Sequence, residues 1–145
     1  FLWRLTAYPM GTETPATAGQ RGANRFTFNQ LGLDAPLFNQ PEAEPETAHI
    51  ATEINTPTPL RRRALYDELE ALRESGSTAS LAYFADNPVL EVLLPAEVNA
   101  CELTAIAPEE IAICNLSTWT PPSGDLEISV AVDPVLGRLV FTGDR

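Results

Sequence analysis

Three consecutive arginines, Arg61, Arg62 and Arg63, are the side chains of this sequence with the clearest chemical implication. They fall on the opening turn of a predicted helix, where the helix dipole is already positive and a cation costs about 0.3–1 kcal/mol. Guanidinium groups bind carboxylates through two parallel hydrogen bonds. We therefore predict that anionic groups lie against this cluster. The alternative is a solvated basic patch that offsets local acidity.

Helical geometry divides these arginines between partners. Successive residues of a helix are rotated by about 100°, so three of them span roughly 200° and cannot all face one group. We expect Arg63 to pair with Asp67 at the i, i+4 spacing. Arg61 and Arg62 are then expected to bind carboxylates of an acidic arm, a neighbouring subunit or a ligand.

A proline-rich acidic segment precedes the arginines and supplies candidate carboxylates. Residues 40–56 interleave two prolines with Glu42, Glu44 and Glu46, a composition that favours an extended arm. We expect this arm to lie along the surface or across a neighbour. Its glutamates could offer oxygens to calcium, but the segment lacks an Asp-rich loop with a coordinating period. We therefore predict no metal and no cofactor.

The tryptophan and cysteine side chains leave two questions open. Trp119 ends a predicted strand just before a proline-rich stretch, and its ring is expected either in the core or at an interface. Cys101 and Cys114 would face each other across a hairpin that turns at Pro108, either as a disulfide or as two thiols. The residues predicted to bind partners are Arg61, Arg62, Arg63, Trp119, Glu42, Glu44 and Glu46.

Catalytic motifs are missing from the sequence. His49 is the single histidine, has no cysteine or aspartate close to it, and fits a structural role. The serines of residues 75–80 lack the glycine pattern of a nucleophile elbow. We predict that the chain is not an enzyme and has no catalytic residues. Its twenty acidic residues leave a hydrolase that uses paired carboxylates as an alternative.

Composition excludes two further classes of partner. The net charge of −11 argues against binding to nucleic acid, whose phosphates attract basic proteins. The chain contains no apolar run near the ~20 residues needed to cross a bilayer, so direct membrane insertion is not expected. All nine basic residues are arginine, which suits ion pairs at interfaces, although genomic base composition explains the bias equally well.

One convincing helix positions the arginines, over residues 59–75. Thr58 is a good N-cap and Pro59 a good first helical residue. A buried stripe is expected where leucines recur at helical spacing, and Glu70 and Arg73 can pair on the surface. Gly76 is a plausible terminating residue. The apolar residues of the stripe are Leu65, Leu69 and Leu72.

The remaining elements are predicted to be strands, so the fold class is a β-rich α+β protein. We expect an antiparallel sheet or sandwich of seven to nine strands with one surface helix. Alternation along residues 126–133 predicts one buried and one solvated side. An Asp-Pro turn follows at residues 133–137. The expected strands cover residues 1–8, 25–28, 81–85, 89–94, 98–106, 110–116, 126–133 and 138–142.

The chain reads as a single module, residues 1–145, which is expected to be a piece of a longer polypeptide because strand-like sequence lies at both ends. Six stretches are structural phrases: FLWRL at 1–5, RFTF at 25–28, LGLDAPLF at 31–38, HIATEIN at 49–55, PLRRR at 59–63 and VDPVLGRLVF at 132–141. In this order they resemble a module of large, mostly uncharacterised bacterial proteins similar to components of phage-tail-like contractile injection systems. The resemblance spans nearly the whole chain and identifies no catalytic residues.

This resemblance implies a structural role in a multi-subunit particle that is assembled in the bacterial cytoplasm, with other protein subunits as partners. Strand-like ends, an acidic arm and an arginine cluster are consistent with such an assembly module. A β-sandwich that binds carbohydrate or cell envelope through Trp119 is the alternative, and the carboxylate-pair hydrolase is the second.

Overall fold

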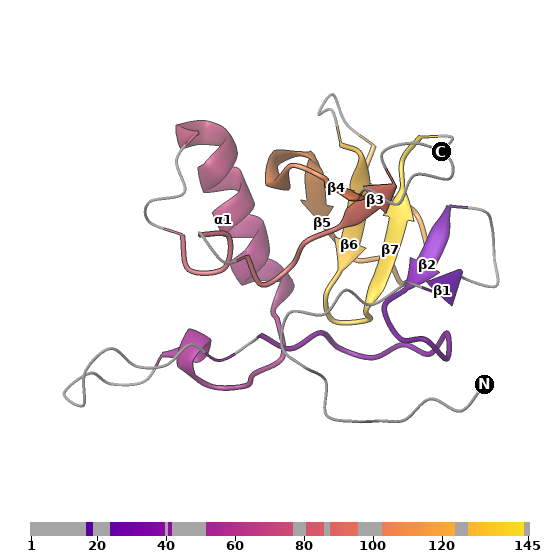
Figure 1. Cartoon of the computed structure of the whole chain (residues 1–145), viewed down its shortest axis with the longest axis horizontal. Helices are drawn as coiled ribbons and strands as arrows, with labels where there is room; N and C mark the ends of the chain where they lie inside the picture. The colour runs from indigo at the N-terminus through magenta and orange to yellow at the C-terminus, as the bar shows by residue number, and fades with distance from the viewer. Residues whose placement is uncertain are drawn as a thin grey trace.

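The protein is described by a computed structural model, which covers residues 17–18, 24–39, 41, 52–76, 81–85, 88–95, 103–123 and 128–143 (Figure 1). Several predictions fall outside these residues: the strand at 1–8, the glutamates at 42, 44 and 46, His49 and Cys101. In the described part the fold is α+β and rich in strands, with one α-helix and two sheets of mostly antiparallel strands. The predicted fold class is therefore confirmed.

Five strands form the larger sheet in the order β1-β2-β7-β6-β5. All neighbours are antiparallel except β5 and β6, which run parallel. A two-stranded antiparallel sheet, β3-β4, crosses in front of it in Figure 1. The strands are β1 (Thr17–Ala18), β2 (Arg25–Thr27), β3 (Leu93–Pro95), β4 (Leu103–Ala105), β5 (Ile111–Ile113), β6 (Val130–Asp133) and β7 (Arg138–Phe141).

The two faces of the five-stranded sheet bury different side chains. Because alternate residues of a strand point to opposite faces, the pairing register places Phe26, Leu139, Val132 and Ile113 in one row. That row belongs to the main hydrophobic core, which also includes the buried leucines of the helix and Val92 and Ile106, the residues next to β3 and β4 in the chain. A smaller cluster occupies the opposite face, built on Leu116, Ala131 and Val140.

The α-helix of the described residues, α1 (Arg62–Ser75), carries the predicted leucine stripe into the main core. Leu65, Leu69 and Leu72 are buried, and the left-handed backbone of Gly76 ends the helix with its N–H donating to the Leu72 carbonyl. On the exposed side, the carboxylate of Glu68 accepts hydrogen bonds from three successive backbone N–H groups in residues 82–84. This contact attaches an irregular loop to the helix.

The predicted helix start was wrong by three residues. The N-cap is Arg61, not Thr58, and no side chain caps the helix. Pro59 instead forms an antiparallel bridge with Phe38, and the N–H of Leu60 donates to the carbonyl of Leu37. Tertiary hydrogen bonds therefore hold this stretch extended, which overrides the local Thr-Pro signal for helix initiation.

The predicted hairpin around Pro108 was also wrong. Residues 108–110 form a short 3₁₀ helix, η2 (Pro108–Glu110), which separates two strands that pair elsewhere. β4 pairs with β3, and β5 runs parallel to β6, so Cys114 has a different strand neighbour from the one predicted. Cys114 is a free thiol, while Cys101 lies outside the described residues. The pattern of alternating residues identified strands here without identifying their partners.

Three further strand predictions need correction. Residues 81–85 form bends, and β3 begins only at Leu93. The side of β6 that was expected to be solvated is buried, because Ala131 and Asp133 are both fully buried. Small and polar residues at alternate positions are typical of the solvent-exposed face of a strand, but here a loop and an arginine cover that face. An arginine from α1 supplies the counter-charge for Asp133, as the next section describes.

Residues 33–39, here called the crossing segment, connect the sheet to the start of α1. The N–H of Ala35 donates to Leu136, and that of Leu37 donates to Pro134, both in the turn between β6 and β7. On its other side the segment meets residues 58–60 through the bridge of Phe38. Figure 1 shows this extended stretch running below the ends of the strands and α1. Its backbone is therefore fixed from two sides.

Candidate functional site

An ion pair between the start of α1 and the end of β6 is the centre of the candidate site. The Nε and one terminal nitrogen of Arg62 donate to the two carboxylate oxygens of Asp133, at 2.8 and 3.0 Å. Such bidentate pairs are the strongest class of side-chain hydrogen bond. The carboxylate is fully buried, while the guanidinium side chain is 33% exposed. This pair joins residues that are 71 positions apart.

The Asp133 carboxylate also accepts three backbone N–H groups, from Leu116, Val135 and Leu136. Burial alone would raise the pKa of Asp133, but the hydrogen bonds from Arg62 and the backbone outweigh it and hold the pKa below its usual value. A carboxylate with this many donors is held as a stable anion. It organises the β6–β7 turn and does not behave as a proton donor.

The neighbouring arginines make ion pairs of a different kind. Arg61 contacts Glu53 at 2.9 Å, with the two side chains 72% and 47% exposed. Arg63 pairs with Asp67 at 2.8 Å across one helical turn, and these side chains are 85% and 51% exposed. The predicted pair of Arg63 and Asp67 is thus confirmed. Every arginine of the cluster therefore has an anionic partner from its own chain, although Arg61 and Arg63 remain largely exposed to solvent.

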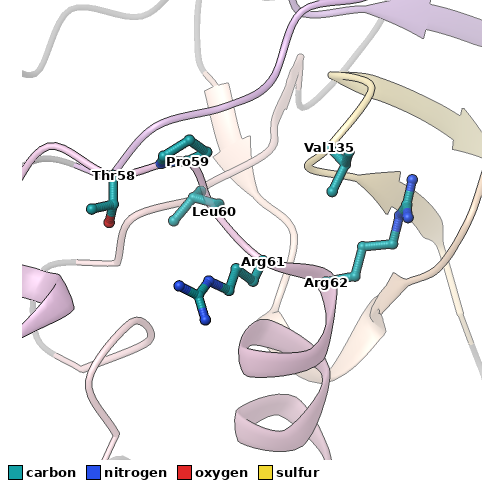
Figure 2. Close-up of a pocket in the computed structure, with 6 residues that line it drawn as sticks. All are labelled: Thr58, Pro59, Leu60, Arg61, Arg62 and Val135. Atoms are coloured by element: carbon teal, nitrogen blue, oxygen red, sulfur yellow. The ribbon is translucent and has the colours of Figure 1, made fainter.

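A pocket of about 410 Å³ opens between the start of α1 and the β6–β7 turn. Its apolar lining comes from Pro59, Leu60 and Val135. Figure 2 shows the side chains of Arg61 and Arg62 leaving the chain in opposite directions, with Arg62 extending on the side of Val135. The remaining lining residue is Thr58.

Buried Asn39 holds together the chain segments beside this pocket. Its amide nitrogen donates to the carbonyl of Glu53, and its amide oxygen accepts the N–H of Thr58 at 2.7 Å. The same side chain therefore joins the crossing segment, the 3₁₀ helix η1 (Glu53–Asn55) and the approach to α1. This arrangement places Glu53 beside Arg61 and holds the pocket lining in position.

Trp119 lies in a second cluster, on the opposite face of the sheet. The guanidinium of Arg138 sits 4.4 Å from the centre of its ring, and Arg138 also makes two hydrogen bonds to the Asp34 carboxylate. Trp119 is half-buried against the cluster of Leu116, and its backbone has the left-handed φ of 59° that is rare for bulky residues. The ring thus serves chiefly to seal the smaller core.

The predicted partner-binding residues are only in part brought together. Arg61 and Arg62 line one pocket, Arg63 faces solvent on α1, and Trp119 belongs to the other face. Glu42, Glu44 and Glu46 lie outside the described residues. The sequence reasoning missed Asp133 and Asn39 as organising residues. An Asp at the end of a strand and before Pro was interpreted as a solvated turn residue, although it is also a suitable acceptor for backbone N–H groups.

The described part of the chain offers little to a catalytic reading. It holds no group of three or more histidine, cysteine, aspartate or glutamate side chains that could bind a metal ion. The thiol of Cys114 has a pKa raised by burial and by the charge of Asp133, which lowers its reactivity. Within the same residues, no helix is long and apolar enough to cross a membrane.

Comparison with known proteins identified no relative of this chain. No protein-family model matches the chain, and no curated protein or solved structure is significantly similar to it.

Proposed function

We propose that this chain is a non-catalytic structural module of a multi-subunit, phage-tail-like contractile injection particle. Its partners would be other protein subunits of that particle, and assembly would take place in the bacterial cytoplasm. The particle type comes from the resemblance of the sequence phrases. The role in assembly is supported by the surface described next.

The observation that carries the proposal is a row of exposed apolar side chains on a fixed backbone. Leu31, Leu33 and Phe38 are 81%, 59% and 56% exposed within eight residues of chain. Val135, at 41%, lies in the turn to which the crossing segment is hydrogen-bonded. Exposed apolar side chains gathered in one short segment are candidates for protein–protein contacts.

The rigidity of this surface favours a permanent partner. Backbone hydrogen bonds hold the crossing segment against the β6–β7 turn, and the bridge of Phe38 holds it against Pro59. A surface that is already ordered loses little conformational entropy on association. The buried pair of Arg62 and Asp133 fixes the same turn from inside. The fold thus presents the apolar row in one conformation.

The alternatives receive less support from the geometry. A sugar-binding aromatic platform needs an open ring face, but the ring of Trp119 is covered by Arg138 and packs on the smaller core. A hydrolase needs two carboxylates in a cleft, one of them with a raised pKa. The carboxylate beside the described pocket, that of Asp133, has a lowered pKa and is fully engaged.

The proposal is tested by following a tagged full-length parent protein into sedimentable particles from the native bacterium. We expect the chain in the particle fraction, and we expect Leu33→Ser with Phe38→Ser to release it without unfolding it. Leu103→Ser is the matched control, because Leu103 is also an exposed leucine but lies on β4. Absence of the chain from every particle fraction would overturn the proposal.

A further inference from the structure

In the described part of the chain, β5 forms one outer edge of the five-stranded sheet. Alternate residues of a paired strand direct their backbone groups to the neighbouring strand, and the residues between them direct theirs outward. The N–H of Cys114 donates to the Val132 carbonyl of β6, so Cys114 and Ala112 face β6. The backbone groups of Ile111 and Ile113 therefore point away from the sheet.

The sequence of β5 does nothing to discourage a further strand from pairing there. An outer edge presents N–H and C=O groups on which a second chain can pair, and folded proteins block such edges with charged side chains, with proline or with a covering helix. β5 consists of Ile-Ala-Ile, without a charge or a proline. Its protection must therefore come from another element, and α1 packs beside it (Figure 1).

Arg73, near the end of α1, covers this edge. Its Nη2 donates to the carbonyl oxygen of Ile111 at 2.6 Å, and its Nε donates to that of Glu109 at 3.0 Å. Its Nη1 pairs with the carboxylate of Glu70 one helical turn away, which holds the guanidinium in place. The Arg73 side chain is only 15% exposed, so it lies packed against the edge and does not extend into solvent.

The short helix η2 closes the other outward group of Ile111. Its N–H donates to the carbonyl of Pro108. Both outward groups of Ile111 are therefore bonded within the chain, the carbonyl to Arg73 and the N–H to η2. A strand added to β5 could bond only to the backbone of Ile113, and a single residue is too little for a ladder.

We propose that Arg73 makes an autoinhibitory contact, which keeps the β5 edge from pairing with the β5 edge of a second copy of this chain. Two copies of one edge are complementary in antiparallel orientation, because a two-fold contact joins the same groups of both chains. A purely structural role for Arg73 would change stability alone, whereas blocking of the edge also changes self-association. The inference does not depend on the proposed function.

The test is sedimentation velocity of the full chain over a concentration series. Arg73→Met keeps much of the packed stem but removes every donor to the edge. We expect it to self-associate about tenfold more tightly than the parent or better, equivalent to about 1.4 kcal/mol. The substitution removes a positive charge from a chain of net charge −11, so the change in charge alone would oppose association. Glu70→Gln is the matched control and should not change association, because Arg73 keeps both carbonyl contacts.

Hydrogen exchange then locates the contact. Residues 111–113 should exchange more slowly in the associated Arg73→Met chain than in the same chain diluted to monomer. If circular dichroism shows that this variant is unfolded, Arg73→Gln takes its place, since glutamine is too short to reach both carbonyls. A folded variant that associates no more tightly than the parent would overturn the proposal, as would association that leaves residues 111–113 unprotected.

Discussion

Three adjacent arginines of one helix start make ion pairs of nearly equal length but very different character. Arg62 holds a carboxylate that is fully buried at the end of a strand, whereas Arg61 and Arg63 hold carboxylates that are about half exposed. The N–O distances all lie between 2.8 and 2.9 Å. Distance therefore does not distinguish them, and burial of the acidic partner does.

The comparison separates a structural role from an interaction role. Removing one member of a buried pair leaves an uncompensated charge, while a surface pair can be replaced by water or by another carboxylate. Arg62 is thus a part of the fold, whereas the pair of Arg61 with Glu53 lies at the surface. A motif of three identical residues thus makes one buried and two exposed ion pairs, and variants of each arginine should separate their contributions.

The largest effect is expected from Arg62→Met, which keeps most of the side-chain length and removes the charge. It should lower the free energy of unfolding by about 3–5 kcal/mol, because the Asp133 carboxylate remains buried without its cation. Arg63→Met is the control and should leave stability unchanged within error. Urea denaturation at neutral pH measures both, and equal effects would remove the distinction between the pairs.

Two glycines extend the same contrast to the backbone. Gly137 and Gly76 have nearly the same φ, 60° and 62°, but a Cβ on Gly137 would lie 2.2 Å from the Ala35 carbonyl oxygen, while none would be near Gly76. Gly76→Ala should cost about 1–2 kcal/mol from the left-handed backbone alone. Gly137→Ala should cost clearly more, because the crossing segment must move. Thermal melts of both variants measure the difference.

Acid should weaken the buried pair by protonating Asp133. Its pKa in the folded protein lies below the value of about 3.9 expected in the unfolded chain. The stabilisation is therefore fully present above that value and is lost as pH falls through the folded pKa. Asp133→Asn should show a smaller loss of stability between pH 6 and about pH 3 than the parent chain.

The control for the acid experiment is Asp67→Asn, which removes the exposed carboxylate paired with Arg63. Its stability should follow the same pH dependence as the parent chain. If Asp133→Asn also followed the parent curve, the buried carboxylate would not be a source of the acid sensitivity, and the comparison between the pairs would fail on this point.

The smallest effect is expected from Arg61→Gln on the isolated chain. Its ion pair with Glu53 is exposed, so the unfolding transition should stay where it is. A marked loss of stability would show that Arg61, like Arg62, belongs to the fold.

Local patterns in the sequence predicted the helix well. The spacing of Leu65, Leu69 and Leu72 predicted the buried stripe, and the ion pairs of Arg63 with Asp67 and of Glu70 with Arg73 formed as expected. The turn between β6 and β7 was predicted from its Asp, Pro and Gly residues. These features depend on interactions between residues that are only a few positions apart, so the local sequence is enough to predict them.

Long-range pairing was beyond the same reasoning. Nothing in the sequence of residues 98–116 distinguishes a hairpin from two strands that each pair with a different strand, since both present the same alternation. Asp133 looked like a polar residue on a wet face until Arg62 was brought to it by folding. The candidate pocket likewise depends on the meeting of residues 58–62 with Val135.

By itself, the sequence determined the strand-rich α+β class, the helix that carries Leu65, Leu69 and Leu72 on its buried face, and a cluster of cations that requires anionic partners. Tertiary structure decided which carboxylate each arginine binds, which strands are neighbours and which apolar side chains stay exposed. The physical reason is the distance along the chain over which each interaction acts. Propensity and helical spacing act over a few residues, whereas the burial that turns an ordinary ion pair into a structural one depends on chain segments as far apart as Arg62 and Asp133.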